Sequence, residues 1–119
     1  MGGEGAEGPA VDRAIVAALL DELGAERTQE ICGAFVQDGH AKLAALQAAL
    51  DGDDAALVAR AAHGLKSGSG FVGAKAVFQL CADMERTAGT GDLDFSRRHL
   101  DDLRDRLAQA EAELVPRHG

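Results

Sequence analysis

The feature that most restricts the fold of this chain is the helical spacing of its apolar residues, which continues from about residue 11 to residue 114. Its two prolines, Pro9 and Pro116, lie outside this region, and no segment shows the two-residue alternation or the β-branched clusters of a strand. The spacing predicts helices over about 11–23, 26–50, 54–72, 74–88 and 94–114, separated by breaks rich in Gly and Asp. We therefore expect an all-α fold, an antiparallel four-helix bundle with an additional short N-terminal helix at one end.

The domain organisation follows from the length and from the first ten residues. A chain of 119 residues corresponds to one domain. Residues 1–10 are acidic and rich in Gly, so we expect a flexible tail there and a single bundle domain over residues 11–115. Each helix should turn one apolar stripe to the core. For the first and third helices the predicted stripes are Val11, Ile15, Leu19 and Leu23, and Leu57, Ala61, Leu65, Gly68 and Val72.

The composition excludes several classes of function. The net charge is −8, and a chain this acidic repels phosphate backbones and anionic lipid, so we expect neither nucleic acid nor a membrane as partner. No apolar run is long enough to span a membrane, and the N-terminus lacks the basic and apolar regions of a signal peptide, so we expect a cytoplasmic protein. Cys32 and Cys81 both lie in apolar helical stretches, and we expect buried free thiols rather than a redox pair.

The position of His63 on its helix is unusual for a lone histidine. On a helical wheel it lies roughly 160° from the centre of the predicted stripe, so it should face solvent. A solvated face normally carries long charged side chains, but this one is mostly small: Ala56, Ala59, Arg60, Lys66, Ser67 and Gly70. The glycines of the segment also weaken the helix, each by up to about 1 kcal/mol relative to Ala. These observations indicate an imidazole on a flat patch that a second protein approaches closely.

Two charged residues could assist chemistry at His63. Lys66 shares its face, and its ammonium could neutralise the phosphoryl oxygens of a modified imidazole. An orienting partner should come from the next helix, where Gln79, Asp83 and Glu85 are candidates and Glu85 is favoured because it flanks the apolar stripe. A carboxylate that accepts from Nδ1–H would leave Nε2 as the outward nucleophile. The alternative interpretations are an ordinary surface lysine and a solvated glutamate.

Other motifs indicate no cofactor. Gly68, Gly70 and Gly73 match the spacing of a dinucleotide-binding loop, but no strand precedes them and they lie within a helix rather than at its start. The histidines lack metal-ligand spacing, so we expect no bound metal: His40, His63, His99 and His118. The chain has no room for an ATP-binding domain, and we expect no kinase activity of its own.

The stretch from Ala62 to Ala74, with the sequence AHGLKSGSGFVGA, closely resembles the signature of histidine-containing phosphotransfer (HPt) domains. The resemblance extends over about residues 11–114 and implies a four-helix bundle with His63 as the phosphoacceptor. Lys66 matches the lysine of the family, and Glu85 falls where several members carry a polar side chain that hydrogen-bonds the imidazole. Gly64 departs from the Thr or larger residue common at its position, and Phe71 is bulkier than the residue often found there.

The resemblance implies a phosphorelay intermediate of a two-component system, and the composition suggests a bacterial one. His63 would accept a phosphoryl group from the aspartyl phosphate of one receiver domain and pass it to another receiver, with Mg²⁺ bound by the receiver. The expected partners are receiver domains of hybrid histidine kinases and response regulators, and a monomer is expected. The expected docking residues surround the histidine: Ala59, Arg60, Gly64, Ser67, Gly70 and Phe71. The alternative is an interaction or dimerisation module of the same fold that binds receiver or kinase domains without relaying phosphate.

Overall fold

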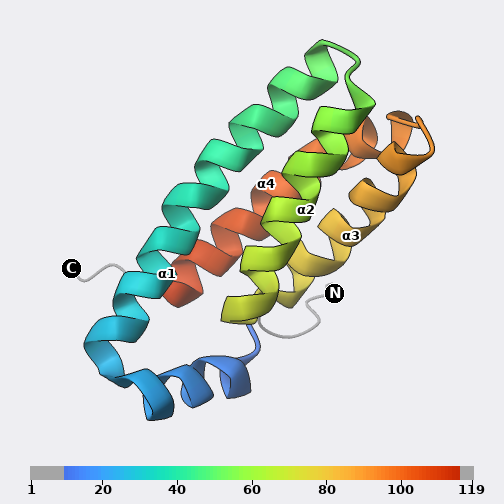
Figure 1. Ribbon diagram of the computed structural model, residues 1–119. Coiled ribbons are helices and arrows are strands. Elements are labelled where there is room, and N and C mark those ends of the chain that lie inside the picture. Colours follow the sequence, from blue (N-terminus) through green and yellow to red (C-terminus); the bar gives the residue numbers. More distant parts are fainter. Residues whose placement is uncertain (1–9, 116–119) are drawn as a thin grey trace.

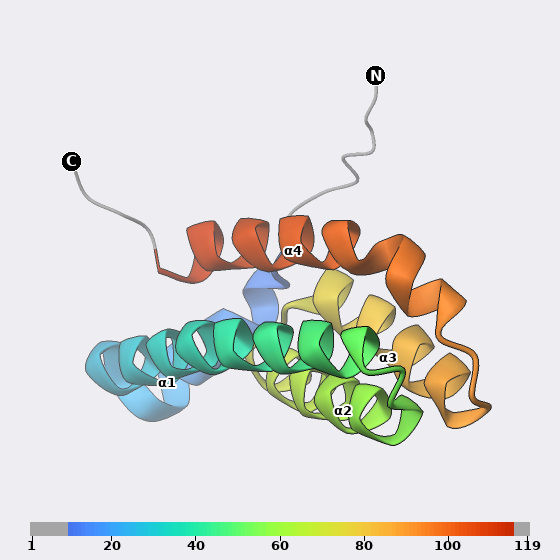
Figure 2. The same cartoon turned by 90° about the horizontal axis from the view of Figure 1, so that it is seen from above.

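The computed structural model describes residues 10–115, and within them it contains four helices and no strand. The helices are α1 (Arg13–Asp51), α2 (Ala55–Val72), α3 (Lys75–Gly89) and α4 (Asp94–Leu114). Figures 1 and 2 show α2, α3, α4 and the long second part of α1 side by side, each antiparallel to the next in sequence. The expected all-α fold of four helices is confirmed, and the last helix has the predicted bounds.

α1 bends at Gly24, whose φ of 84° and ψ of 167° interrupt the helical conformation. Only glycine adopts such angles at little cost, because a Cβ would clash with the backbone. In Figure 1 the segment before the bend, in blue, crosses one end of the bundle, and the rest of α1 then runs along it. The residues of the predicted short N-terminal helix lie in the part of α1 before this bend.

A tight connection joins α2 to α3. Gly73 ends α2 in the left-handed conformation, with a φ of 79°, and the amide of Ala74 donates to the Ser69 carbonyl at 2.8 Å. The next helix begins at Lys75, so α2 and α3 form an antiparallel hairpin. Residues at nearly equal distances from Gly73 therefore lie opposite one another, and His63 and Glu85 are such a pair.

The start of the described chain is fastened to the bundle at two points. The amides of Ala10 and Val11 donate to the Glu113 carboxylate at 2.8 and 3.0 Å, and the amide of Asp12 donates to the Gly73 carbonyl at 2.7 Å. Ala10 is buried. The other residues of the predicted tail, 1–9, lie outside the described residues.

The core is built from the inner stripes of all four helices. In α2 the buried stripe is rotated about the helix axis relative to the predicted one. In α2 the buried residues are Val58, Ala61, Ala62, Leu65, Ser69 and Val72. The prediction for Leu57 was wrong: Val58 occupies the core position at this end of α2, and Leu57 is 46 % exposed. Ile15 and Leu23 are also exposed, because the segment before Gly24 covers only the end of the bundle. Ser69 is tolerated inside because its hydroxyl donates to the Leu65 carbonyl at 2.5 Å.

The two cysteines are buried and free, as expected. Burial raises the pKa of Cys81 to about 12, so this thiol stays protonated at neutral pH. Among residues 10–115, no helix is both long enough and apolar enough to cross a membrane.

Candidate functional site

His63 lies on the outer surface of α2, with 60 % of its side chain exposed. The preceding residue, Ala62, is fully buried, and Leu65, two residues after His63, lies in the core. The helix therefore presents the imidazole to solvent on the side opposite its core stripe, as the helical wheel predicts.

Glu85 of α3 holds one side of the imidazole. Its Oε2 atom lies 3.0 Å from Nδ1 of His63. An ionised carboxylate only accepts hydrogen bonds, so the proton of the neutral ring must be on Nδ1, and Nε2 carries the free lone pair. Of the other two candidates for the orienting partner, Asp83 instead accepts a hydrogen bond from Arg86 at 2.8 Å, and Gln79 is exposed to solvent. The structure thus brings Glu85 to His63 by way of the hairpin at Gly73.

Lys66 contacts the same carboxylate. Its Nζ atom lies 2.8 Å from Oε1 of Glu85, so one carboxylate contacts the Lys66 ammonium and the His63 ring together. The hydrogen bond from Lys66, followed by that from His63, holds the pKa of Glu85 below its ordinary value, although desolvation opposes this. Glu85 is therefore ionised at neutral pH, as the assignment of the ring proton requires.

The glycines of α2 make room for three large side chains that the sequence analysis did not place here. A Cβ on Gly68 would lie 3.2 Å from the Phe35 ring, and a Cβ on Gly70 would lie 3.3 Å from the Phe78 ring. A Cβ on Gly64 would lie 2.3 Å from Cε of Lys42, because that side chain crosses α2 at this point. The small residues around His63 thus make room for contacts within the chain.

Phe78 was missed by the sequence analysis, although a signal for it existed. Phe78 lies outside the buried face of α3, which consists of Val77, Leu80, Cys81, Met84 and Ala88, and a large apolar residue at an outward position indicates a contact there. In the structure Phe78 is 39 % exposed beside Gly70. Together with Ile15 it lines an open depression at the end of the α2–α3 hairpin, and we call Ile15, Gly70 and Phe78 the apolar patch.

The six predicted docking residues do not have equal access to solvent. Arg60, Ser67, Gly70 and Phe71 are exposed, and Phe71 is 56 % exposed. Ala59 and Gly64 are half-buried, Gly64 because Lys42 lies over it.

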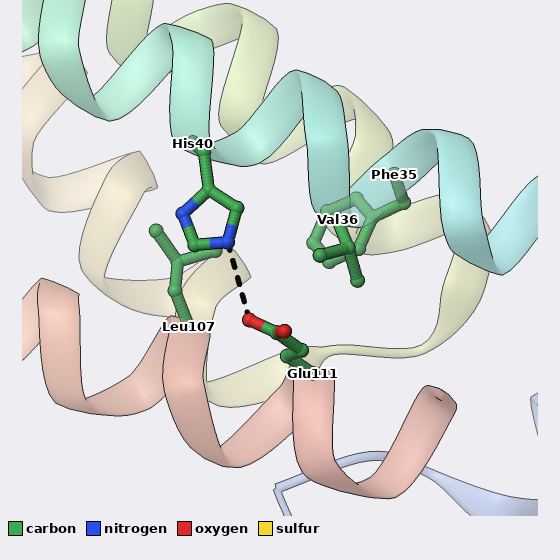
Figure 3. A pocket seen from close by; sticks show the side chains of 5 residues that line it. All are labelled: Phe35, Val36, His40, Leu107 and Glu111. Atoms are coloured by element: carbon green, nitrogen blue, oxygen red, sulfur yellow. Dashed lines mark hydrogen bonds and ion pairs between the residues drawn. The ribbon is translucent and has the colours of Figure 1, made fainter. Parts of the chain in front are cut away.

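The other histidines of the described chain have different surroundings. His40 of α1 lies 3.2 Å through Nε2 from Oε1 of Glu111 in α4, beside Phe35, Val36 and Leu107 (Figure 3). The space enclosed there is about 10 Å³, room for no more than about one water molecule. His99 stacks against Phe95, with ring centroids 4.3 Å apart. His40 is thus an interhelical contact on a different pair of helices from His63.

The other candidate motifs in the sequence were the glycines of α2 and the histidines. Gly68 and Gly70 lie inside α2 and Gly73 at its C-terminal end, so none of them opens a helix toward a phosphate group. Within residues 10–115, no group of three or more His, Cys, Asp or Glu side chains could hold a metal ion.

A helical bundle that presents an exposed imidazole, with Nδ1 held by a carboxylate and Nε2 free, has the arrangement of a histidine phosphotransfer protein. The sequence model of the Hpt domain matches residues 30–113, so the chain belongs to the Hpt domain family. The family expected from residues 62–74 is thereby confirmed.

Among solved structures, the chain is similar to histidine-containing phosphotransfer protein B of Pseudomonas aeruginosa PAO1. The two share 25 % sequence identity, and the similarity covers 89 % of this chain and 91 % of that chain with a TM-score of 0.85. No match to this chain was found among the curated proteins.

Proposed function

We propose that this protein is a phosphorelay intermediate of a two-component system, in which His63 accepts a phosphoryl group from the aspartyl phosphate of a receiver domain and passes it to the aspartate of another. The observation that carries the proposal is the hydrogen bond between Nδ1 of His63 and Glu85, at 3.0 Å, on an exposed helix face of an Hpt domain. Transfer requires a ring nitrogen with a free lone pair that a partner's active site can reach, and Nε2 meets both conditions.

The electrons and protons balance without a further base. The lone pair of Nε2 attacks phosphorus, and the bond from phosphorus to the aspartyl oxygen breaks with its electron pair returning to the carboxylate. Nδ1 keeps its proton, so the ring becomes positively charged as the N–P bond forms. The Glu85 carboxylate, 3.0 Å away, stabilises that charge. Transfer to the next receiver is the same reaction in reverse, and the Mg²⁺ belongs to the receiver in both directions.

Lys66 supplies the charge for the phosphoryl oxygens in this proposal. It lies one turn from His63 on α2, and its Nζ atom lies 2.8 Å from Oε1 of Glu85. A phosphoryl group on Nε2 adds negative charge beside Glu85, and a flexible ammonium one turn away can move toward it. We therefore assign Lys66 the stabilisation of phosphohistidine and Glu85 the orientation of the ring.

The apolar patch is the part of the surface that we assign to contact with the receiver. It lies on the same face of α2 as His63, because Gly70 follows His63 by seven residues, which is two helical turns. The depression beside it has a volume of about 220 Å³ and is bounded by α2, α3 and the start of α1. Ser67 and Phe71 lie near the patch at the end of α2, whereas Ala59 and Arg60 lie on the other side of His63, near the start of the helix. A small interface of this kind suits a transient encounter.

The proposal also includes properties that membership of the Hpt domain family does not determine. We propose a monomer without kinase activity and without a cofactor of its own, and the cytoplasmic location expected from the sequence stays a prediction. We also propose that the segment before Gly24 acts as a separate short helix capping the bundle, which the bend at Gly24 and the bond from Asp12 to Gly73 support.

The test is transfer from a panel of phosphorylated receiver domains, read as protein-bound label that is acid-labile and base-stable. We expect His63→Gln to abolish the label while the helical content measured by circular dichroism stays unchanged. The matched control is His40→Gln, which removes another exposed histidine that contacts a glutamate and should keep the label. Label retained on His63→Gln would contradict the proposal. Receivers that bind the wild-type protein without labelling it would instead support the interaction module.

A further inference from the structure

Lys42 is placed beside the phosphoacceptor by the absence of a side chain at residue 64. Its side chain reaches from α1 across α2, so that a Cβ on Gly64 would lie 2.3 Å from Cε, 2.9 Å from Cδ and 3.6 Å from Nζ. Gly64 directly follows His63. Any larger residue at this position would displace the lysine from its present path.

The Lys42 ammonium has a weak partner within the chain. It lies 2.9 Å from Oδ1 of Asp38, one turn earlier on α1, and the Asp38 side chain is mostly exposed. An exposed pair of this kind contributes little to stability and is easily exchanged for another anion. The stem of the lysine therefore lies against Gly64, while its charged end is held only by this exposed pair and can exchange Asp38 for an anion of a partner.

Arg60 adds a second positive charge on the same side of the histidine. Arg60 and Gly64 are four residues apart on α2, so they are neighbours on one helix face. Arg60 is exposed and forms no ion pair with any residue between 10 and 115. We call Lys42 and Arg60 the cationic rim.

The cationic rim and the Glu85–Lys66 pair lie on opposite sides of His63. Glu85 belongs to α3, and it draws the imidazole and Lys66 toward that helix. Lys42 belongs to α1 and meets α2 on its other side, at Gly64. The rim therefore borders the imidazole without being part of the group that orients it.

We infer that the cationic rim binds the anionic edge of the active site of the incoming receiver, with Lys42 held ready by the gap at Gly64. The inference rests on the proposed function, which brings an aspartyl phosphate and the carboxylates that bind its Mg²⁺ onto His63. This chain has a net charge of −8, so an acidic partner is repelled at long range unless positive charge lies at the point of contact. Lys42 and Arg60 supply that charge and set the affinity of docking rather than the rate of transfer.

The experiment measures transfer from the fastest phosphorylated receiver of the panel as its concentration is varied, at low and at high salt. We expect Lys42→Ala to raise KM about five-fold at low salt with kcat within about two-fold, and the difference from wild type to shrink at high salt because of screening. Lys42→Arg should restore most of the affinity. Arg98→Ala is the charge control, because Arg98 is exposed on α4, which is not a direct neighbour of α2 in the bundle.

Gly64→Ala tests the same contact from the other helix. Its Cβ would displace Lys42, so KM should rise as in Lys42→Ala, whereas in a Lys42→Ala background it should cause no further rise. Because Ala favours a helix more than Gly does, unfolding cannot account for such a defect. Phosphoramidate, a small donor that transfers its phosphoryl group with loss of ammonia, should label the wild type and Lys42→Ala equally fast.

Two results would overturn this inference while leaving the proposed function intact: an unchanged KM for Lys42→Ala at low salt, or additive effects of Gly64→Ala and Lys42→Ala. A panel in which no receiver labels the wild-type protein would overturn the proposed function itself, and with it this inference.

Discussion

Nδ1 of His63 and Oε2 of Glu85 lie 3.0 Å apart across the α2–α3 hairpin. This single contact decides which nitrogen of the imidazole is available, because a carboxylate can only accept and the ring proton must therefore be on Nδ1. Helix α2 alone exposes the histidine, but only its pairing with α3 gives the ring an orientation.

The ring of His63 should be the Nδ1–H tautomer in the unphosphorylated protein, with Nε2 bare. ¹⁵N NMR of the imidazole reports this directly. Glu85→Ala should let the ring exchange between tautomers and slow transfer by on the order of ten-fold, because a wrongly protonated ring cannot attack. Glu85→Gln keeps an acceptor oxygen, so its transfer rate should lie between those of the wild type and Glu85→Ala. A ring that is Nε2–H in the wild type would refute this orientation.

The pKa of Glu85 should lie below its ordinary value of 4.5, chiefly because of the hydrogen bond from Lys66. A carboxyl whose pKa is depressed by folding stabilises the protein above the unfolded value, and that contribution is lost as the pH falls through the folded value. NMR titration of the Glu85 side-chain carboxyl should show the shift. Lys66→Met should move the pKa upward, whereas Lys75→Met, at an exposed lysine elsewhere, should leave it unchanged.

Phe78→Ala should weaken docking more than folding. The ring is 39 % exposed, so its truncation should cost less than the roughly 3–5 kcal/mol typical of a buried Phe, whereas KM for a phosphorylated receiver should rise several-fold. Gly70→Leu should act in the same direction by displacing the ring. The control is Leu57→Ala, an exposed apolar residue near the start of α2. Equal KM values for Phe78→Ala and the wild type would remove the apolar patch from the interface.

Gly73→Ala should lower the free energy of unfolding by about 1–3 kcal/mol. The residue has a φ of 79°, and an added Cβ would lie 2.9 Å from Cβ of Ile15 and 3.1 Å from the Asp12 carbonyl. Thermal or urea denaturation measures the loss. Gly33→Ala provides the comparison: it lies within α1 with open space where a Cβ would be, so it should be neutral or stabilising.

Much of the fold could be predicted from local patterns, because each helix end has a local cause. The last helix is an example. The Gly-Thr-Gly break before it and its apolar spacing are visible in the sequence, and the observed helix, Asp94–Leu114, has the predicted bounds. The inner face of α2 was harder to predict. Val58 and Leu57 are adjacent and equally apolar, and which of them is buried depends on how α2 is rotated against its neighbours, a tertiary property that a helical wheel does not contain.

The same distinction applies to the candidate site. The exposure of His63 follows from the wheel, and Glu85 follows from the hairpin, since both depend on regular geometry. Lys42 and Phe78 do not, because they reach the site across helix contacts that involve the glycines of α2. Glycine in a helix indicates a close approach but does not say which side chain approaches.

Glu85 faces two cations, and this has a consequence for the direction of phosphate flow. When a dianionic group arrives on the imidazole, Lys66 can turn to it while the carboxylate keeps the newly charged ring. When the group departs, the ammonium returns to a carboxylate that has stayed in place. In this proposal the empty form has no unmatched charge, whereas the loaded form keeps one negative phosphoryl charge, because a dianion faces one ammonium, and the cation-binding active site of a receiver can meet it. Which receiver gains the phosphoryl group is then decided by the receivers.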